Sequence, residues 1–113
     1  MDEYTVIVTP DAEYDLNELD DYITFELLAP DTATAYVAFI KKELETLSYM
    51  PMRNRLVDDE PWHSRGVSRM NVKNFAVFYY VFEDYHEVYI QNVIYQKRDI
   101  PQVLRDLYGD DFT

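Results

Sequence analysis

The eight residues FAVFYYVF, at positions 75–82, decide how the chain can fold. All eight are apolar or aromatic, so neither face of the segment is suited to water. A strand of this composition is typical of the centre of a sheet whose two faces are both covered. We therefore expect a central strand at this position, with a helical layer on one of its faces.

Three further segments complete the predicted sheet. Residues 67–72 precede the central strand and residues 87–95 follow it, and a short polar turn separates each of them from the centre. Connections this short join antiparallel neighbours. Residues 4–9 are β-branched and aromatic and stop at Pro10, which predicts a fourth strand.

Two helices are predicted between the first strand and the other three. Thr9 is suited to cap the first helix, and Pro10 is suited to its first turn. Apolar residues recur at helical spacing on both sides of Pro30; they are Ala12, Leu16, Leu19, Ile23 and Leu27 before it, and Ala33, Val37, Ile40, Leu44 and Leu47 after it. A connection as short as the one at Pro30 places the two helices side by side, as an antiparallel hairpin.

The remaining segments are a loop and a closing helix. Residues 52–64 have no periodicity, so we expect a loop that Trp62 pins to the sheet. Pro101 is suited to start a last short helix. The predicted order is β-α-α-β-β-β-α, an α+β fold in which a long antiparallel helical hairpin packs on a mainly antiparallel four-stranded sheet. With no linker-like stretch, residues 1–113 are expected to form a single domain.

Composition excludes several kinds of site. The chain has no cysteine, so disulfides, thiolate zinc sites and cysteine nucleophiles are excluded. It has two glycines, which cannot form a glycine-rich phosphate loop. The N-terminus does not resemble a signal peptide, and no run of about 18 apolar residues is present. We expect a cytoplasmic protein that needs no cofactor, binds no metal and contacts no membrane.

Charge is distributed unevenly along the chain. Residues 1–50 contain 12 acidic side chains and two lysines, a net charge of −10, whereas residues 51–113 contain 10 acidic and 8 basic side chains, a net charge of −2. The total of −12 disfavours long-range attraction to nucleic acid. Residues 61–82 contain three basic side chains and no acid, so an anion would bind there.

The predicted order of elements and three local patterns resemble the RelE/ParE superfamily of type II toxins, and the likeness extends over nearly the whole chain. The three patterns are YTVIVTPDAEYDL at residues 4–16, DEPWHSRGVSR at residues 59–69, and NFAVFY at residues 74–79 followed by VYIQNVIYQKRD at residues 88–99. In that family the first pattern leads a strand into a helix, the second brings arginines onto the second strand, and the third forms the last two strands. The resemblance implies a RelE/ParE-like fold and one half of a bacterial toxin-antitoxin pair.

The resemblance also implies partners. A cognate antitoxin would lay a helix or strand across apolar parts of the hairpin or sheet, with cationic residues facing the acidic helices. Operator DNA would be reached only through that antitoxin. The toxic target would be gyrase in one branch of the superfamily, which acts by protein contact, and the ribosome with its mRNA in the ribonuclease branch.

A member of the ribonuclease branch would be a metal-independent endoribonuclease. Such a site needs cations on the phosphate, a base and an acid. Arg65, Arg69 and Arg98 would contact phosphate, while His63 or Tyr95 would transfer protons. Arg65 and Arg69 are four residues apart on the expected strand, so their side chains would lie on one face and clamp one phosphate.

Each of these residues also has a purely structural interpretation. The two arginines of the strand would form ion pairs with the acidic helices or with the acidic triplet at residues 58–60, which is otherwise solvated. His63 would be an exposed loop histidine, and Tyr95 an aromatic at the edge of the sheet.

Two departures from the ribonuclease pattern favour the gyrase branch. Ala76 stands where many ribonuclease members carry an arginine, and Tyr95 stands where many carry a histidine. The acidity is also unlike that of ribosome-binding members, which are typically basic. We expect a toxin that inhibits growth through a protein target of the gyrase type. The alternatives are a ribosome-dependent mRNA endoribonuclease and a degenerate, non-toxic binding module.

Overall fold

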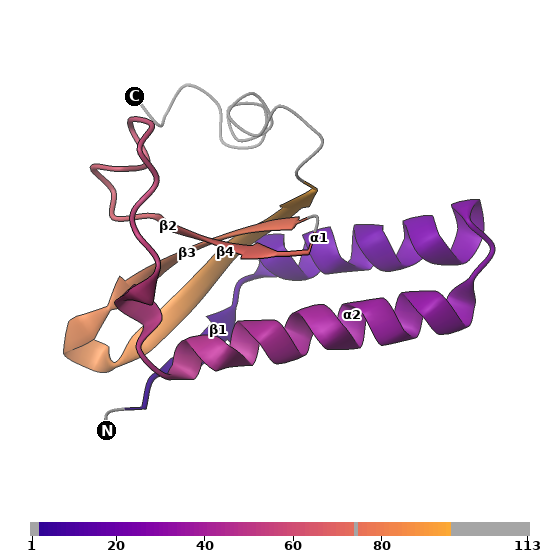
Figure 1. Ribbon diagram of the computed structural model, residues 1–113, viewed down its shortest axis with the longest axis horizontal. Coiled ribbons are helices and arrows are strands. Elements are labelled where there is room, and N and C mark those ends of the chain that lie inside the picture. Colours follow the sequence, from indigo (N-terminus) through magenta and orange to yellow (C-terminus); the bar gives the residue numbers. More distant parts are fainter. Residues whose placement is uncertain (1–2, 74, 96–113) are drawn as a thin grey trace.

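The computed structural model describes residues 3–73 and 75–95 (Figure 1). Its main elements are β1 (Thr5–Val8), α1 (Pro10–Asp21), the π-helical turn η1 (Tyr22–Glu26), α2 (Pro30–Glu45), β2 (Ser68–Val72), β3 (Phe75–Phe82) and β4 (Glu87–Tyr95). Three short 3-10 turns accompany them: η2 (Thr46–Ser48), η3 (Pro51–Arg53) and η4 (Glu83–Tyr85). The helix expected at Pro101 lies outside the described residues. No helix within them is long and apolar enough to cross a membrane.

The four strands form one mixed sheet in the order β1-β4-β3-β2. β1 runs parallel to β4, and the β4-β3 and β3-β2 pairs are antiparallel. This confirms the mainly antiparallel four-stranded sheet, with residues 75–82 in an interior strand. The bounds of β3 and β4 are those predicted, whereas β1 and β2 are shorter than the predicted segments 4–9 and 67–72.

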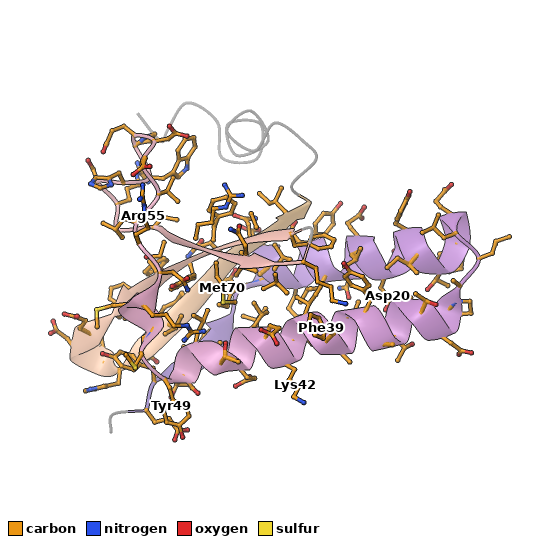
Figure 2. All side chains as sticks on the ribbon, viewed as in Figure 1. Asp20, Phe39, Lys42, Tyr49, Arg55 and Met70 are labelled. Atoms are coloured by element: carbon orange, nitrogen blue, oxygen red, sulfur yellow. The ribbon has the colours of Figure 1, made fainter. Side chains whose placement is uncertain are left out.

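The helices α1 and α2 form an antiparallel hairpin that covers one face of the sheet and extends beyond its edge (Figure 1). The main core lies between these layers and consists of Ala12, Leu16, Ile40, Leu44, Leu47, Met70, Val72, Phe75, Val77, Tyr79, Val88, Ile90 and Val93. Figure 2 shows Met70 between the sheet and the hairpin, whereas Lys42 points from α2 into solvent. The predicted packing of a helical hairpin on the sheet is confirmed.

The other face of the sheet is covered only in part. A second buried cluster forms there, where the loop before β2 folds back over β3 and β4; it consists of Trp62, Val67, Ala76, Phe78 and Ile94. Trp62 therefore pins the loop to the sheet, as predicted. Residues 75–79 are buried on both faces, but the cover ends beyond them and Phe82 is 43% exposed. The prediction of a strand covered on both faces is thus wrong for its last residues.

The first helix departs from its prediction at the far end of the hairpin. α1 ends at Asp21 and continues as one π turn, in which the Leu27 N–H donates to Tyr22 O at 3.2 Å. A π turn closes hydrogen bonds over five residues instead of four, so it moves Leu27 off the apolar stripe. Leu27 is 56% exposed, although its spacing predicted a buried position.

The start of α1 is capped as predicted. Thr9 Oγ1 accepts a hydrogen bond from the Ala12 N–H at 3.3 Å and donates one to Ile90 O at 2.7 Å. Pro10 occupies the first turn. One hydroxyl therefore fixes both the helix start and its position against β4.

Candidate functional site

Arg65 and Arg69 do not lie on one strand, contrary to the prediction. Arg69 is on β2, but Arg65 is in the preceding turn, where its N–H donates to Pro61 O at 3.2 Å. Gly66 lies between them with a φ of +78°, a left-handed conformation that glycine adopts without strain. Because the chain turns at Gly66, strand periodicity does not place the two arginine side chains on one face.

Arg69 is exposed on the face of the sheet opposite the hairpin, which we call the open face. Its Nε donates to Asn71 Oδ1 at 3.0 Å, and its guanidinium carbon lies 6.0 Å from the centre of the Phe78 ring. This distance is within the range of a cation–π contact. Phe78 thereby links Arg69 to the surface that surrounds Trp62.

His63 is exposed in the same turn as Arg65, as its structural interpretation predicted. Its Nδ1 lies 2.9 Å from Val57 O. A carbonyl oxygen only accepts hydrogen bonds, so the proton of the neutral ring is assigned to Nδ1. A role for His63 in proton transfer stays a prediction.

Tyr95 and Arg98 were the remaining predicted site residues. Tyr95 ends β4 and pairs with Phe75 of β3 in the sheet register. Arg98 lies outside the described residues. The catalytic roles of both therefore stay predictions.

A hollow of about 400 Å³ lies on the open face, between the turn before β2 and the exposed parts of β3 and β4. It is lined by Trp62, Arg65, Gly66, Val67, Phe78, Tyr80, Val81, Phe82, Gln91 and Asn92. Most of these side chains are aromatic or aliphatic, and Arg65 supplies the one formal charge among the lining residues.

Four aromatic rings extend the surface of the hollow. We call Tyr80, Phe82, Tyr85 and Tyr89 the aromatic cluster. The Tyr80 and Tyr89 rings are stacked with centres 5.4 Å apart, and the Phe82 ring meets them edge-on at 5.1 and 5.4 Å. Rings that pack on one another in this way form a firm apolar surface with polar hydroxyls at its margin.

Asp15 supports the hollow from the helical side of the sheet. Its Oδ2 accepts hydrogen bonds from the Val93 N–H at 3.0 Å and from Asn92 Nδ2 at 3.1 Å, and Asn92 lines the hollow. Burial raises the pKa of the Asp15 carboxyl, while the two hydrogen bonds oppose that shift. Asp15 was not predicted as a site residue from the sequence. The available signal was its position three residues after Ala12, on the side of the helix that faces the sheet.

Metal binding finds no support in the described part of the chain. Within residues 3–73 and 75–95, no group of three histidine, aspartate or glutamate side chains is placed to hold a metal ion.

Comparison with known proteins gives one family match and two similar folds. Residues 6–100 match the family described as ParE toxin of type II toxin-antitoxin system, parDE. A chain from the chromosomal ParDE toxin-antitoxin system of P. aeruginosa has a TM-score of 0.69 and 19% identity, over 84% of this chain and 98% of its own length. A chain from the RelBE2 toxin-antitoxin complex of Mycobacterium tuberculosis has a TM-score of 0.56 and 23% identity, over 82% of this chain and 98% of its own length. No curated protein sequence matches significantly.

Proposed function

The chain belongs to the ParE toxin family of type II toxin-antitoxin systems, and on this basis we propose that it stops growth by binding DNA gyrase. The observation that favours a protein target over RNA cleavage is the make-up of the hollow on the open face. Its lining is mostly aromatic and aliphatic, with Arg65 as its one formal charge. RNA cleavage instead needs a base, an acid and cations gathered around a phosphate. The surface is better suited to contact with a protein.

Net charge supports the same proposal. At −12, the chain is repelled by the phosphates of RNA, whereas the same charge attracts a protein that presents a basic surface. We expect the toxin to act in the cytoplasm, where it would meet gyrase.

The proposal is tested by giving the purified chain both candidate targets. It is added to purified gyrase with relaxed plasmid, and separately to a cell-free translation system whose mRNA 5′ ends are mapped. We expect supercoiling to be inhibited and the mRNA to stay intact. Codon-positioned cleavage of the mRNA with normal supercoiling would overturn the proposal.

A ribosome-dependent mRNA endoribonuclease is the second candidate, and the positions of two arginines favour it. Arg65 lines the hollow, and Arg69 lies over the ring of Phe78, which also lines it. On this reading, Arg65→Ala and Arg69→Ala should each relieve growth arrest while the circular dichroism spectrum stays unchanged. Retained toxicity in both variants would remove these arginines from an active site.

We also propose that a cognate antitoxin neutralises the chain by covering the hollow and the aromatic cluster. The two similar structures come from toxin-antitoxin systems. A concave, mostly apolar surface accepts a helix or strand of a partner. Glu83 and Asp84 follow Phe82 directly, and Glu87 pairs with it across the sheet, so the partner should carry lysine or arginine.

Co-purification with the antitoxin tests this surface. Phe82→Glu should reduce co-purification, because it adds a charge where an apolar contact is expected. Phe39→Glu is the control, since Phe39 has a similar exposure of 38% and lies on α2, outside the lining of the hollow. Equal co-purification of the Phe82→Glu variant and the wild type would assign the antitoxin to another surface.

A further inference from the structure

We infer that the exposed tip of the helical hairpin is the point at which the chain docks on its protein target, and that the target offers an apolar pocket edged by basic side chains. This depends on the proposed function, because it requires a toxin that acts on a protein. The tip comprises η1 and the turn that leads into α2, and it projects away from the sheet (Figure 1).

Four large apolar side chains are exposed at the tip. We call Tyr22, Phe25, Leu27 and Leu28 the tip patch; their exposed fractions are 54%, 70%, 56% and 81%. Single exposed apolar residues are common on protein surfaces, but a group of this size in one short segment marks an interaction site.

The backbone turns Leu27 and Leu28 outward. The π turn moves Leu27 off the buried stripe of the helix. Leu28 has a φ of +55°, a left-handed conformation that is strained for leucine but easily adopted by glycine or asparagine. Because its side chain is exposed, packing within the chain does not compensate for the strain.

The tip is also held in place. The Ala29 N–H donates to Ile23 O at 3.1 Å, and the Ala33 N–H donates to Ala29 O at 2.9 Å. Ile23 and Ala33 are both buried. The tip patch is therefore formed before any partner arrives, which lowers the entropic cost of binding.

Charge around the tip identifies the chemistry of the partner. Residues 20–31 contain Asp20, Asp21, Glu26 and Asp31, and no lysine or arginine. These carboxylates attract a basic surface and repel a second copy of this chain. The shape of the tip indicates that the target and the antitoxin bind at different surfaces. The tip projects and fits a pocket in a folded partner, whereas the hollow on the open face fits a helix or strand of a partner.

Leu28→Asn is the direct test, because asparagine tolerates the left-handed backbone and removes the apolar contact. Met50→Asn is the matched control. Met50 is also left-handed, with a φ of +46°, and is 66% exposed, but it lies beyond the opposite end of α2. Binding of each full-length chain to immobilised gyrase is measured, together with its melting temperature and its growth arrest on induction.

We expect Leu28→Asn to weaken gyrase binding at least about tenfold and to relieve growth arrest. Its melting temperature should not fall below that of the wild type, and Met50→Asn should bind as the wild type does. Glu26→Lys should weaken binding and reduce its dependence on salt.

Equal binding and equal arrest by Leu28→Asn and the wild type would overturn the inference and leave the proposed function standing. Loss of antitoxin binding by Leu28→Asn with full growth arrest would also overturn it, by assigning the tip patch to the antitoxin. A wild-type chain that neither binds gyrase nor stops growth would refute the proposed function, and this inference with it.

Discussion

Among single residues, Asp15 is the polar side chain that joins α1 to β4. Its carboxylate accepts hydrogen bonds from the Val93 N–H and from Asn92, and burial raises its pKa. Because the folded-state pKa lies above the unfolded value, the folded chain binds more protons than the unfolded chain between these two values. The contribution of this titration to stability is full below the unfolded pKa and is lost as pH rises through the folded pKa.

Asp15→Asn removes the titration and keeps one acceptor oxygen. We expect the unfolding free energy of the variant, relative to that of the wild type, to increase as pH rises through the folded-state pKa of Asp15. Urea unfolding from acidic to neutral pH measures this difference. Asp15→Ala is the control, which removes the acceptor for two donors and should cost about 1–3 kcal/mol. A difference between wild type and Asp15→Asn that does not change with pH would contradict the expectation.

Tyr79 places a hydroxyl in the main core. It donates to Pro51 O at 2.7 Å and accepts from Asn54 Nδ2 at 3.1 Å, so it ties the segment after α2 to β3. Tyr79→Phe should lower the unfolding free energy by about 1–2 kcal/mol, measured by urea denaturation. Tyr80→Phe, on the open face, should change it by less than about 0.5 kcal/mol. Equal effects of the two substitutions would contradict the role given to the Tyr79 hydroxyl.

The residues of the candidate site could be predicted only in part. Trp62 was correctly placed, because a lone tryptophan in a loop has a large apolar surface to bury. The placement of Arg65 on the strand was wrong, because a four-residue spacing indicates one face only along a continuous strand, although both arginines lie close to Phe78. Gly66 breaks that strand with a left-handed turn, and a glycine at this point was the available warning.

At the scale of elements, the sheet and the hairpin could be predicted because each follows from a simple pattern. β3 is apolar at every position, and polar turns bound it on both sides. The π turn could not be predicted, since Leu27 keeps helical spacing and the local pattern does not distinguish a five-residue hydrogen bond from a four-residue one. The open end of β3 could not be predicted either, because its exposure depends on how far the loop over the sheet extends.

Trp62 is the largest side chain that packs this loop against the sheet, and Trp62→Ala tests how much it contributes. Removing a buried tryptophan should lower the unfolding free energy by about 3–5 kcal/mol, measured by chemical denaturation. Trp62→Phe is the control and should cost less, because an aromatic ring still covers Phe78. Trp62 is the single tryptophan of the chain, so its fluorescence in the wild type reports whether the loop is docked. A loss below about 1 kcal/mol in Trp62→Ala would show that the loop is held by other contacts.

At the scale of the whole molecule, the distribution of charge separates the hairpin from the sheet. The first 50 residues carry a net charge of −10, and the remaining 63 carry −2. The two helices therefore present an acidic surface, and the arginines near β2 lie in the less charged half. This asymmetry matches a toxin that is recognised by basic protein surfaces.

We predict that the isolated chain binds bare RNA weakly. Fluorescence anisotropy with a labelled random RNA should show little binding at physiological salt, because the net charge of −12 repels phosphate. An Arg65→Ala, Arg69→Ala double variant serves as the control and should behave as the wild type does. Tight, salt-sensitive binding by the wild type would contradict the prediction and favour the ribonuclease candidate.

The most direct test of a gyrase-binding toxin is to induce this chain alone in bacteria and to map DNA breaks and RNA 5′ ends in the same cells. We predict growth arrest with gyrase-dependent DNA breaks and no new RNA ends. Codon-positioned RNA ends without DNA breaks, or normal growth, would contradict it.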